Sequence, residues 1–252
     1  MVDECQDITA AQLRLLAAIA GTGPDALFFA GDLGQRIFQQ PFSWNQYGID
    51  IRGRSRTLRI KYRTSQQIRQ QADQLLDPES RDVDGNVQDR RGAVSVISGP
   101  DPVIRECDDH ECEIEAVAGW IKDRLTEGLT AREFGVFVRS PQELARAKAA
   151  LELAELPYEQ LQPTAMRLGS KATLSTMHLA KGLEFRAVVV MACDEDVIPN
   201  AERIKALTDD SDLEEVVATE RHLLYVACTR ARDYLLITSG DTCSEFVEDL
   251  LG

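Results

Sequence analysis

The chain has 252 residues, enough for one large domain or for one domain together with part of another. Its formal net charge of −14 argues against a protein that binds nucleic acid through its overall charge, so any contact with DNA must use a local basic patch. No apolar run approaches the roughly 18 residues that a membrane span requires, and the scattered cysteines favour a reducing cytoplasm over a disulfide framework.

The first part of the chain mixes helical and extended patterns. Apolar side chains recur at helical spacing over residues 8–20, which predicts a helix. Residues 26–32 form a short apolar run that ends in Gly-Asp, as a buried strand does, and residues 57–63 alternate like a strand. A second helix is predicted next, with Thr64 or Ser65 as its N-cap.

The rest of the chain alternates predicted strands and helices. After a polar, turn-rich loop over 79–92, the pattern predicts strands over 93–98, 134–139, 173–179, 185–193 and 234–238, and helices over 111–127, 141–155 and 214–232. Alternation at these intervals indicates an α/β fold with a mostly parallel sheet.

One cysteine cluster has two interpretations. The stretch ECDDHECE brings Cys107, His110 and Cys112 close together in the sequence, and these residues could supply three zinc ligands. No fourth ligand follows at the spacing of a zinc finger, and the stretch leads into a Glu-rich helix. The alternative is the solvated acidic start of a helix.

Acidic residues follow two of the apolar runs. Asp3 and Glu4 come after Met-Val, and Asp32 ends the run over 26–32. Functional groups of α/β sheets gather at the carboxyl ends of the strands. An Asp next to a Glu suits nucleotide hydrolysis, because one carboxylate can hold Mg²⁺ while the other orients and deprotonates the attacking water. Acidic pairs are also common on surfaces, so the pair alone is a weak indication.

Several further stretches give this pair a context. In chain order they are VDECQD (2–7), GDLGQRIF (31–38), LRIKYRTS (58–65), TMHLAKGLEF (176–185) and ERHLLYVACTRA (220–231). In this order and spacing they resemble motifs II to VI of the UvrD/Rep/PcrA-like superfamily 1 DNA helicases, and the resemblance spans nearly the whole chain. It implies a RecA-like parallel sheet preceded by a partial first RecA-like domain.

The resemblance implies that the first two motifs act on ATP and Mg²⁺. Asp3 would coordinate the metal ion, and Glu4 would be the general base for the attack of water. Gln35 would sense the γ-phosphate and couple it to contacts with DNA.

The later motifs would supply the other side of the ATP site. By the same resemblance, Arg63 and Arg230 would be two arginine fingers, and Glu184, with Gly182 beside it, would contact the nucleotide. A guanidinium from a facing domain neutralises the charge of the phosphoryl-transfer transition state only when the cleft is closed, which ties hydrolysis to domain motion. The alternative for both arginines is an ordinary surface position.

A basic stretch suggests where DNA could bind. The basic side chains of residues 51–63 are Arg52, Arg54, Arg56, Arg59, Lys61 and Arg63, and the aromatic side chains nearby are Phe38, Phe42, Trp44 and Tyr47. Cations interleaved with aromatic rings suit single-stranded DNA. The alternative is a charged interdomain connector whose aromatic side chains pack into the core. The resemblance adds Thr176 and His178 to the surface that meets DNA.

The predicted organisation has two parts. Residues 1–54 would be the remnant of the first RecA-like domain, and residues 55–252 would be the second, without the large accessory insertion of longer family members. The chain departs from the family at Lys61, where Asn is usual, and at Cys5, where another small or a larger apolar residue is usual.

The sequence contains no phosphate-binding loop of the form GxxxxGK[ST], which the family places before motif II. Without the amides and the lysine of that loop there is no cradle for the β- and γ-phosphates. We therefore expect the C-terminal part of an ATP-dependent 3′→5′ DNA helicase or translocase, inactive alone. It would need an N-terminal segment with this loop and would act on single-stranded or partly duplex DNA. The alternative is a non-catalytic module that binds nucleic acid or protein.

Overall fold

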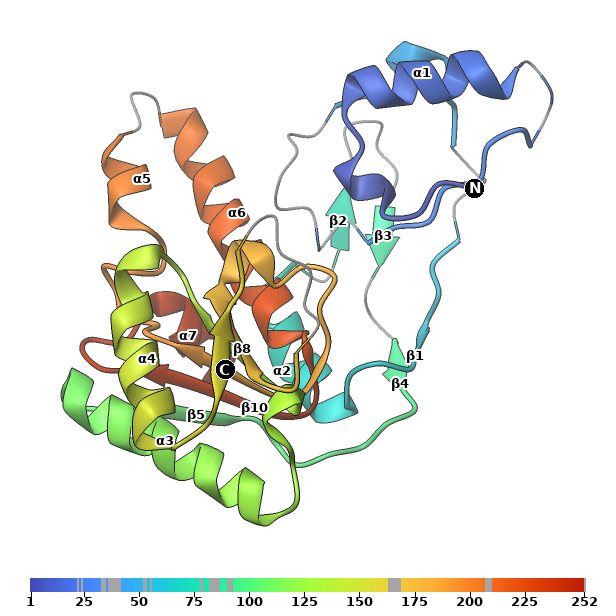
Figure 1. Cartoon of the computed structure of the whole chain (residues 1–252). Coiled ribbons are helices and arrows are strands. Elements are labelled where there is room, and N and C mark those ends of the chain that lie inside the picture. The colour runs from blue at the N-terminus through green and yellow to red at the C-terminus, as the bar shows by residue number, and fades with distance from the viewer. Residues whose placement is uncertain are drawn as a thin grey trace. The chain divides into compact units, whose positions relative to one another are not determined.

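The computed structural model of the chain describes all residues except 22, 24, 33–34, 36–41, 52–53, 55, 78, 82–86, 90–92, 163–168, 207–209 and 252. The described residues form two compact units (Figure 1). The smaller unit comprises Met1–Ile60 and Asp77–Val94, and the larger unit comprises Lys61–Leu76 and Ser95–Gly252. Within these described ranges, no helix has both the length and the apolar character needed to cross a membrane.

The larger unit is built on a six-stranded sheet in the order β5-β10-β9-β6-β8-β7. Every neighbouring pair of strands is parallel, which confirms the predicted α/β fold. The strands are β5 (Val103–Glu106), β6 (Phe134–Val138), β7 (Tyr158–Gln160), β8 (Ala172–Thr176), β9 (Phe185–Met191) and β10 (Ala231–Ser239).

Helices cover both faces of this sheet (Figure 1). The helices of this unit are α2 (Gln66–Asp73), α3 (His110–Thr126), α4 (Leu144–Leu153), α5 (Ala201–Lys205), α6 (Asp210–Cys228) and α7 (Glu245–Leu251). Helices α3 and α4 contact each other and one face, whereas α2 and α6 contact each other and the opposite face. A parallel sheet covered on both faces needs strands that are apolar throughout, and all five residues of β6 are buried.

Two helix starts confirm sequence expectations. Ser65 caps α2, because its side chain accepts a hydrogen bond from the amide of Ile68 at 3.4 Å. Asp109 caps α3 by accepting from the amide of Cys112 at 2.7 Å. The stretch that contains Cys107 and His110 thus forms an acidic helix start. Among the described residues, no group of three metal-binding side chains is placed to hold a metal ion.

The smaller unit contains the helix α1 (Ala10–Ala20) and the antiparallel pair β2 (Glu79–Arg81) and β3 (Val87–Asp89). The expected helix over 8–20 is confirmed, and its N-terminus carries a capping box between Thr9 and Gln12. The expectation of a loop throughout 79–92 is wrong for the two strands. A polar composition does not exclude them, because backbone groups make the hydrogen bonds of a ladder.

Three expected strands are shorter in the structure. The run over 26–32 forms only an isolated parallel bridge between Val2 and Phe29. The runs over 57–63 and 93–98 are reduced to the two-residue strands β1 (Ile60–Lys61) and β4 (Val94–Ser95), which pair with each other. An alternating pattern therefore located these strands but overestimated their length.

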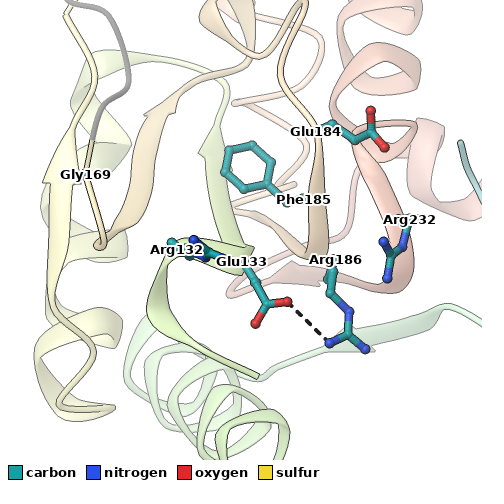
Figure 2. A pocket seen from close by; sticks show the side chains of 7 residues that line it. All are labelled: Arg132, Glu133, Gly169, Glu184, Phe185, Arg186 and Arg232. Atoms are coloured by element: carbon teal, nitrogen blue, oxygen red, sulfur yellow. Dashed lines mark hydrogen bonds and ion pairs between the residues drawn. The ribbon is translucent and has the colours of Figure 1, made fainter. Parts of the chain in front are cut away.

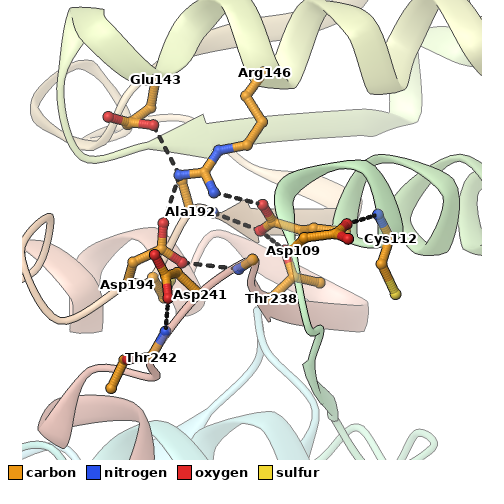
Figure 3. A network of polar contacts seen from close by, with 12 residues as sticks. Asp109, Cys112, Glu143, Arg146, Ala192, Asp194, Thr238, Asp241 and Thr242 are labelled. Atoms are coloured by element: carbon orange, nitrogen blue, oxygen red, sulfur yellow. Dashed lines mark hydrogen bonds and ion pairs between the residues drawn. The ribbon is translucent and has the colours of Figure 1, made fainter.

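A buried ionic network closes the edge of the sheet where β9 and β10 end (Figure 3). The Arg146 guanidinium on α4 donates through Nη2 to Glu143 at 2.8 Å and to Asp194 at 2.6 Å. Its Nη1 lies 3.0 Å from Oε2 of Glu113 on α3. The network therefore joins two helices to the segment that follows β9.

Glu113 is the central carboxylate of this network and is fully buried. Its Oε1 accepts hydrogen bonds from Thr238 Oγ1 at 2.6 Å and from the amide of Ala192 at 2.9 Å. Burial raises the pKa of Glu113 above its ordinary value, and the hydrogen bonds of Thr238 and Ala192 and the charge of Arg146 act in the opposite direction. Burial therefore makes the charged form of Glu113 unfavourable in the folded state, and the charge of Arg146 offsets this cost.

We expect Arg146→Met to destabilise the protein by about 3–5 kcal/mol at pH 8, because it leaves buried carboxylates without their cation. Without Arg146, the pKa of Glu113 rises further in the folded state. A carboxyl group with a raised folded pKa favours the folded state at low pH, so the loss of stability should be smaller at pH 5. The free energy of unfolding from urea titrations at both pH values checks this expectation.

The matched control is Arg221→Met, which removes an arginine from a partly exposed ion pair with Asp249. It should cost about 1 kcal/mol or less at either pH. An equal loss of stability at pH 5 and pH 8 for Arg146→Met would show that the charge of the network is not what stabilises this edge.

Candidate functional site

Three residues predicted to contact the nucleotide lie where β9 and β10 begin. Glu184 directly precedes β9, and Arg230 lies between the end of α6 and the start of β10. Arg63 lies shortly before α2, and its Nε is 3.8 Å from Oε2 of Glu184. The structure therefore brings Arg63, Glu184 and Arg230 to one edge of the sheet, although they are far apart in the sequence.

The two arginines at this edge have different surroundings. The Arg63 side chain is 83% exposed and that of Glu184 is 50% exposed, so their ion pair holds Arg63 only weakly. Arg230 is only 8% exposed. Its Nε donates to the carbonyl of Val226 at 3.0 Å and its Nη1 to that of Leu183 at 3.4 Å. Arg63 therefore projects into solvent, whereas Arg230 is folded back against the end of α6.

A pocket of ≈ 390 Å³ lies beside Glu184 (Figure 2). Its lining residues are Arg132, Glu133, Gly169, Glu184, Phe185, Arg186 and Arg232. Arg186 donates to Asp233 at 2.7 Å and to Glu133 at 3.3 Å, and Arg232 donates to Asp233 at 2.8 Å. Hydrogen bonds from Arg232 and Arg186 hold the pKa of Asp233 below its ordinary value. The guanidinium groups of Arg186 and Arg232 are thus paired with carboxylates, and the half-exposed carboxylate of Glu184 can accept hydrogen bonds from hydroxyl groups of a ligand.

Thr176 and His178 lie at the opposite edge of the sheet. Thr176 is the last residue of β8, and His178 is in the 3₁₀ turn that follows. Burial, and then the charge of Arg139, lowers the pKa of His178. Residues 177–184 therefore run from the end of β8 to the start of β9, and so from one edge of the sheet to the other. The 3₁₀ turn in this segment contacts α6.

A second buried carboxylate lies near His178 and was not predicted. Glu220 on α6 accepts from Arg139 Nη2 at 2.5 Å and from Arg203 Nη1 at 2.8 Å. Arg139 follows the buried run of β6, and Glu220 opens the last motif-like stretch. A polar residue directly after a fully apolar strand was the signal that could have identified Arg139.

The smaller unit joins two other predicted residues through a chain of hydrogen bonds. Glu4 accepts from the side-chain amide of Gln6, and Gln6 Oε1 accepts from the backbone amide of Asp32 at 3.1 Å. Gln35 Nε2 donates to Asp32 Oδ2 at 3.1 Å. The structure thus connects Glu4 to Gln35, and the connection runs through Gln6, for which no role was predicted.

Close packing supports this arrangement. A Cβ atom at Gly31 would lie 2.4 Å from Gln6 Oε1 and 2.6 Å from Cys5 Sγ, so a larger residue there would displace the Gln6 side chain from its position beside Asp32. Asp3, the predicted Mg²⁺ ligand, is exposed and accepts from the amide of Glu4 at 2.9 Å. Its carboxylate could supply one oxygen ligand to a metal ion.

The predicted DNA-binding aromatic residues are partly packed against protein. Trp44 is half-buried and meets Phe29 edge to face, with ring centroids 4.7 Å apart. Arg54 forms an exposed ion pair with Asp25. Phe38 lies outside the described residues. The packing of Trp44 agrees with the alternative of a connector whose aromatic side chains are packed. The basic side chains agree with DNA binding, because they are exposed: Arg54, Arg56, Arg59, Lys61 and Arg63.

These features define an α/β domain with a charged candidate site where β9 and β10 begin. Comparison with known proteins shows what this domain is similar to. Residues 148–242 match the family described as UvrD-like helicase C-terminal domain. The ATP-dependent DNA helicase PcrA of Staphylococcus epidermidis is 47% identical over 70 residues, which are 28% of this chain and 9% of that protein. A probable DNA helicase of Mycoplasma pneumoniae is 28% identical over 254 residues, which cover 95% of this chain and 43% of that protein.

A solved structure agrees at the level of the fold. The C-terminal domain of a possible DNA helicase from Lactobacillus plantarum superimposes with a TM-score of 0.52 at 21% identity, and the match covers 75% of this chain and 94% of that one. The chain is thus similar to the C-terminal portion of UvrD/PcrA-like helicases, with the family match confined to residues 148–242. It spans less than half of the length of these curated relatives.

We expect Gly135→Ala to destabilise the protein by about 1–3 kcal/mol through overpacking. The added Cβ would lie 2.7 Å from the ring of Phe185, which is buried and packs against Phe137. Phe185 directly follows Glu184, so this packing holds the backbone beside the candidate site. Gly119→Ala is the control, since no heavy atom lies within 4 Å of its added Cβ in α3. It should gain about 0.5–1 kcal/mol. A Gly135→Ala protein as stable as wild type in urea titrations would contradict the packing argument.

Proposed function

We propose that the chain is the C-terminal part of an ATP-dependent DNA helicase or translocase with 3′→5′ polarity. The observation that carries the proposal is the gathering of Arg63, Glu184 and Arg230 at one edge of the parallel sheet. Two cations and a carboxylate suit a nucleoside triphosphate, because guanidinium groups stabilise phosphoryl oxygens and a carboxylate accepts hydrogen bonds from ribose hydroxyls. ATP supplies the phosphoryl group whose transfer to water releases the free energy for movement.

In this proposal each residue has a defined task. Asp3 holds one coordination position of Mg²⁺, and Glu4 accepts a proton from the attacking water. Gln35, joined to Glu4 through Gln6 and Asp32, senses the γ-phosphate and couples it to the contacts with DNA. Arg63 and Arg230 neutralise the charge that develops on the transferring phosphoryl group.

The proposal assigns residues 1–54 to the end of a first RecA-like domain and residues 55–252 to a second. The division of the described residues near residue 60 supports the boundary between the two, whereas residues 77–94 belong to the smaller unit. The phosphate-binding loop would come from an N-terminal segment outside the sequence, and DNA would meet Thr176, His178 and the basic residues before Arg63. The six free cysteines fit a cytoplasmic location.

One observation favours the alternative of a non-catalytic module. Arg230 is buried and donates hydrogen bonds to the carbonyl oxygens of Val226 and Leu183 and to the hydroxyl oxygen of Thr229. A helix end can use an arginine in this way for structure alone, since cations stabilise the carbonyl end of a helix. In that case Arg63 and Arg230 would have no role in hydrolysis.

Steady-state ATP hydrolysis by the complete gene product in the presence of oligo-dT distinguishes the two functions. Arg230→Ala should lower kcat by about 10³-fold with a much smaller change in KM, as expected for a group that acts on the transition state. Arg63→Ala should also lower kcat, and its unfolding temperature should stay that of wild type because the side chain is 83% exposed.

Arg221→Ala is the control, because it removes a different arginine, one within α6, and it should keep the kcat of wild type. Values of kcat within a few-fold of wild type for both Arg63→Ala and Arg230→Ala would favour the non-catalytic module.

A further inference from the structure

Hydrogen bonds join the segment that carries Arg63 to the segment that carries Arg230. Thr64 Oγ1 donates to the carbonyl oxygen of Thr229 at 3.3 Å, across 165 positions of the sequence. The amide of Ser65 donates to the carbonyl oxygen of Arg232 at 2.9 Å. Arg63 is therefore adjacent in sequence to Thr64, and Arg230 is adjacent to Thr229.

Thr229 contacts both sides of this connection. Its carbonyl oxygen faces Thr64, and its hydroxyl oxygen accepts from Arg230 Nη2 at 3.3 Å. The same hydroxyl donates toward the carbonyls at the end of α6, at 2.9 Å from that of Tyr225. These hydrogen bonds attach Thr229 to the end of α6. Thr229 in turn binds Arg230 and Thr64.

Close packing holds the connection together. A Cβ atom at Gly99 would lie 3.1 Å from Ser65 Cβ and 3.2 Å from the carbonyl oxygen of Asp233. Gly99 therefore packs against both joined segments. A Cβ atom at this position would make tight contacts with both of them.

The ion pair of Arg63 cannot replace these contacts. Arg63 and Glu184 are 83% and 50% exposed, and an exposed pair at 3.8 Å fixes neither side chain. The backbone therefore sets the position of the Arg63 side chain. The hydrogen bonds of Thr64 and Ser65 hold this backbone in place.

We infer that Thr64 and Thr229 are positioning residues that set Arg63 and Arg230 at a fixed separation. The inference rests on the proposed function, in which both guanidinium groups act on one phosphoryl group. Two charges can stabilise one transition state only when both are held close to the productive geometry. Neither threonine needs to touch the nucleotide, because each acts through the arginine beside it.

The first test measures the connection itself in this chain. Thr64→Val keeps the branched shape of the side chain and removes the hydroxyl donor. Hydrogen–deuterium exchange of the Ser65 amide, read by NMR, should become about tenfold faster or more, because the opening of the joined segments becomes easier. The control is Thr219→Val, which removes a hydroxyl that donates at 2.9 Å within α6. It should leave the exchange of Ser65 unchanged. Unchanged exchange of Ser65 in Thr64→Val would overturn the inference.

The second test measures ATP hydrolysis by the complete gene product. Thr64→Val should lower kcat by about 10- to 100-fold with KM within a few-fold of wild type, as expected for a misplaced catalytic group. Thr64→Ser keeps the donor and should restore kcat. In the Arg63→Ala background, Thr64→Val should have little further effect, because the group that it positions is already gone.

The outcomes separate the inference from the proposed function. If Arg63→Ala lowers kcat but Thr64→Val does not, or if their effects multiply, the positioning role is wrong and the function stands. If Arg63→Ala leaves kcat unchanged, the proposed function fails and the inference fails with it.

Discussion

A parallel sheet covered by helices on both faces leaves only its two edges for polar groups. The strands β6 and β9 are almost entirely buried, and their one charged residue, Arg186, is the second residue of β9 and lies where that strand begins. The arginines and carboxylates of the larger unit therefore gather where strands begin or end. This constraint decides which residues can meet, whatever their distance in the sequence.

The two edges use their charges differently. At the edge where strands end, buried networks form around Arg146, which pairs with three carboxylates, and around Glu220, which pairs with Arg139 and Arg203. Such networks fix the packing of helices against the sheet and leave few charges for a ligand. At the edge where β9 and β10 begin, Arg63 and Glu184 are exposed and only loosely paired. An edge with exposed, weakly paired charges is the one suited to bind a charged ligand.

One segment connects these edges. Residues 177–184 run from Thr176 and His178 at the end of β8 to Glu184 at the start of β9, and the carbonyl of Leu183 accepts from Arg230. A displacement at one end of so short a connection can reach the other end through the backbone. In the proposed function this segment links the surface that meets DNA to the residues that meet ATP.

Periodicity and motif order predicted the fold class and the residues of the candidate edge. The alternation of apolar runs predicted the parallel sheet, because burial on both faces leaves a clear signal in each strand. The sequence could not predict the network of Arg146, since its partners on α3 and after β9 meet only in the folded chain. Nor could it predict that Arg230 is buried while Arg63 is exposed, because a motif specifies a residue type and not its contacts. The role of Gln6 between Glu4 and Asp32 was missed for the same reason.

Photo-crosslinking with an ATP analogue that carries an aryl azide on its γ-phosphate tests the central claim most directly. The complete gene product would be irradiated with this analogue, and the labelled peptides would be mapped by mass spectrometry. If the edge where β9 and β10 begin binds the nucleotide, label should appear within residues 61–65, 183–186 or 229–232 and should be displaced by excess ATP. Label confined to the opposite edge, at residues 139–146 or 194–203, would contradict the account.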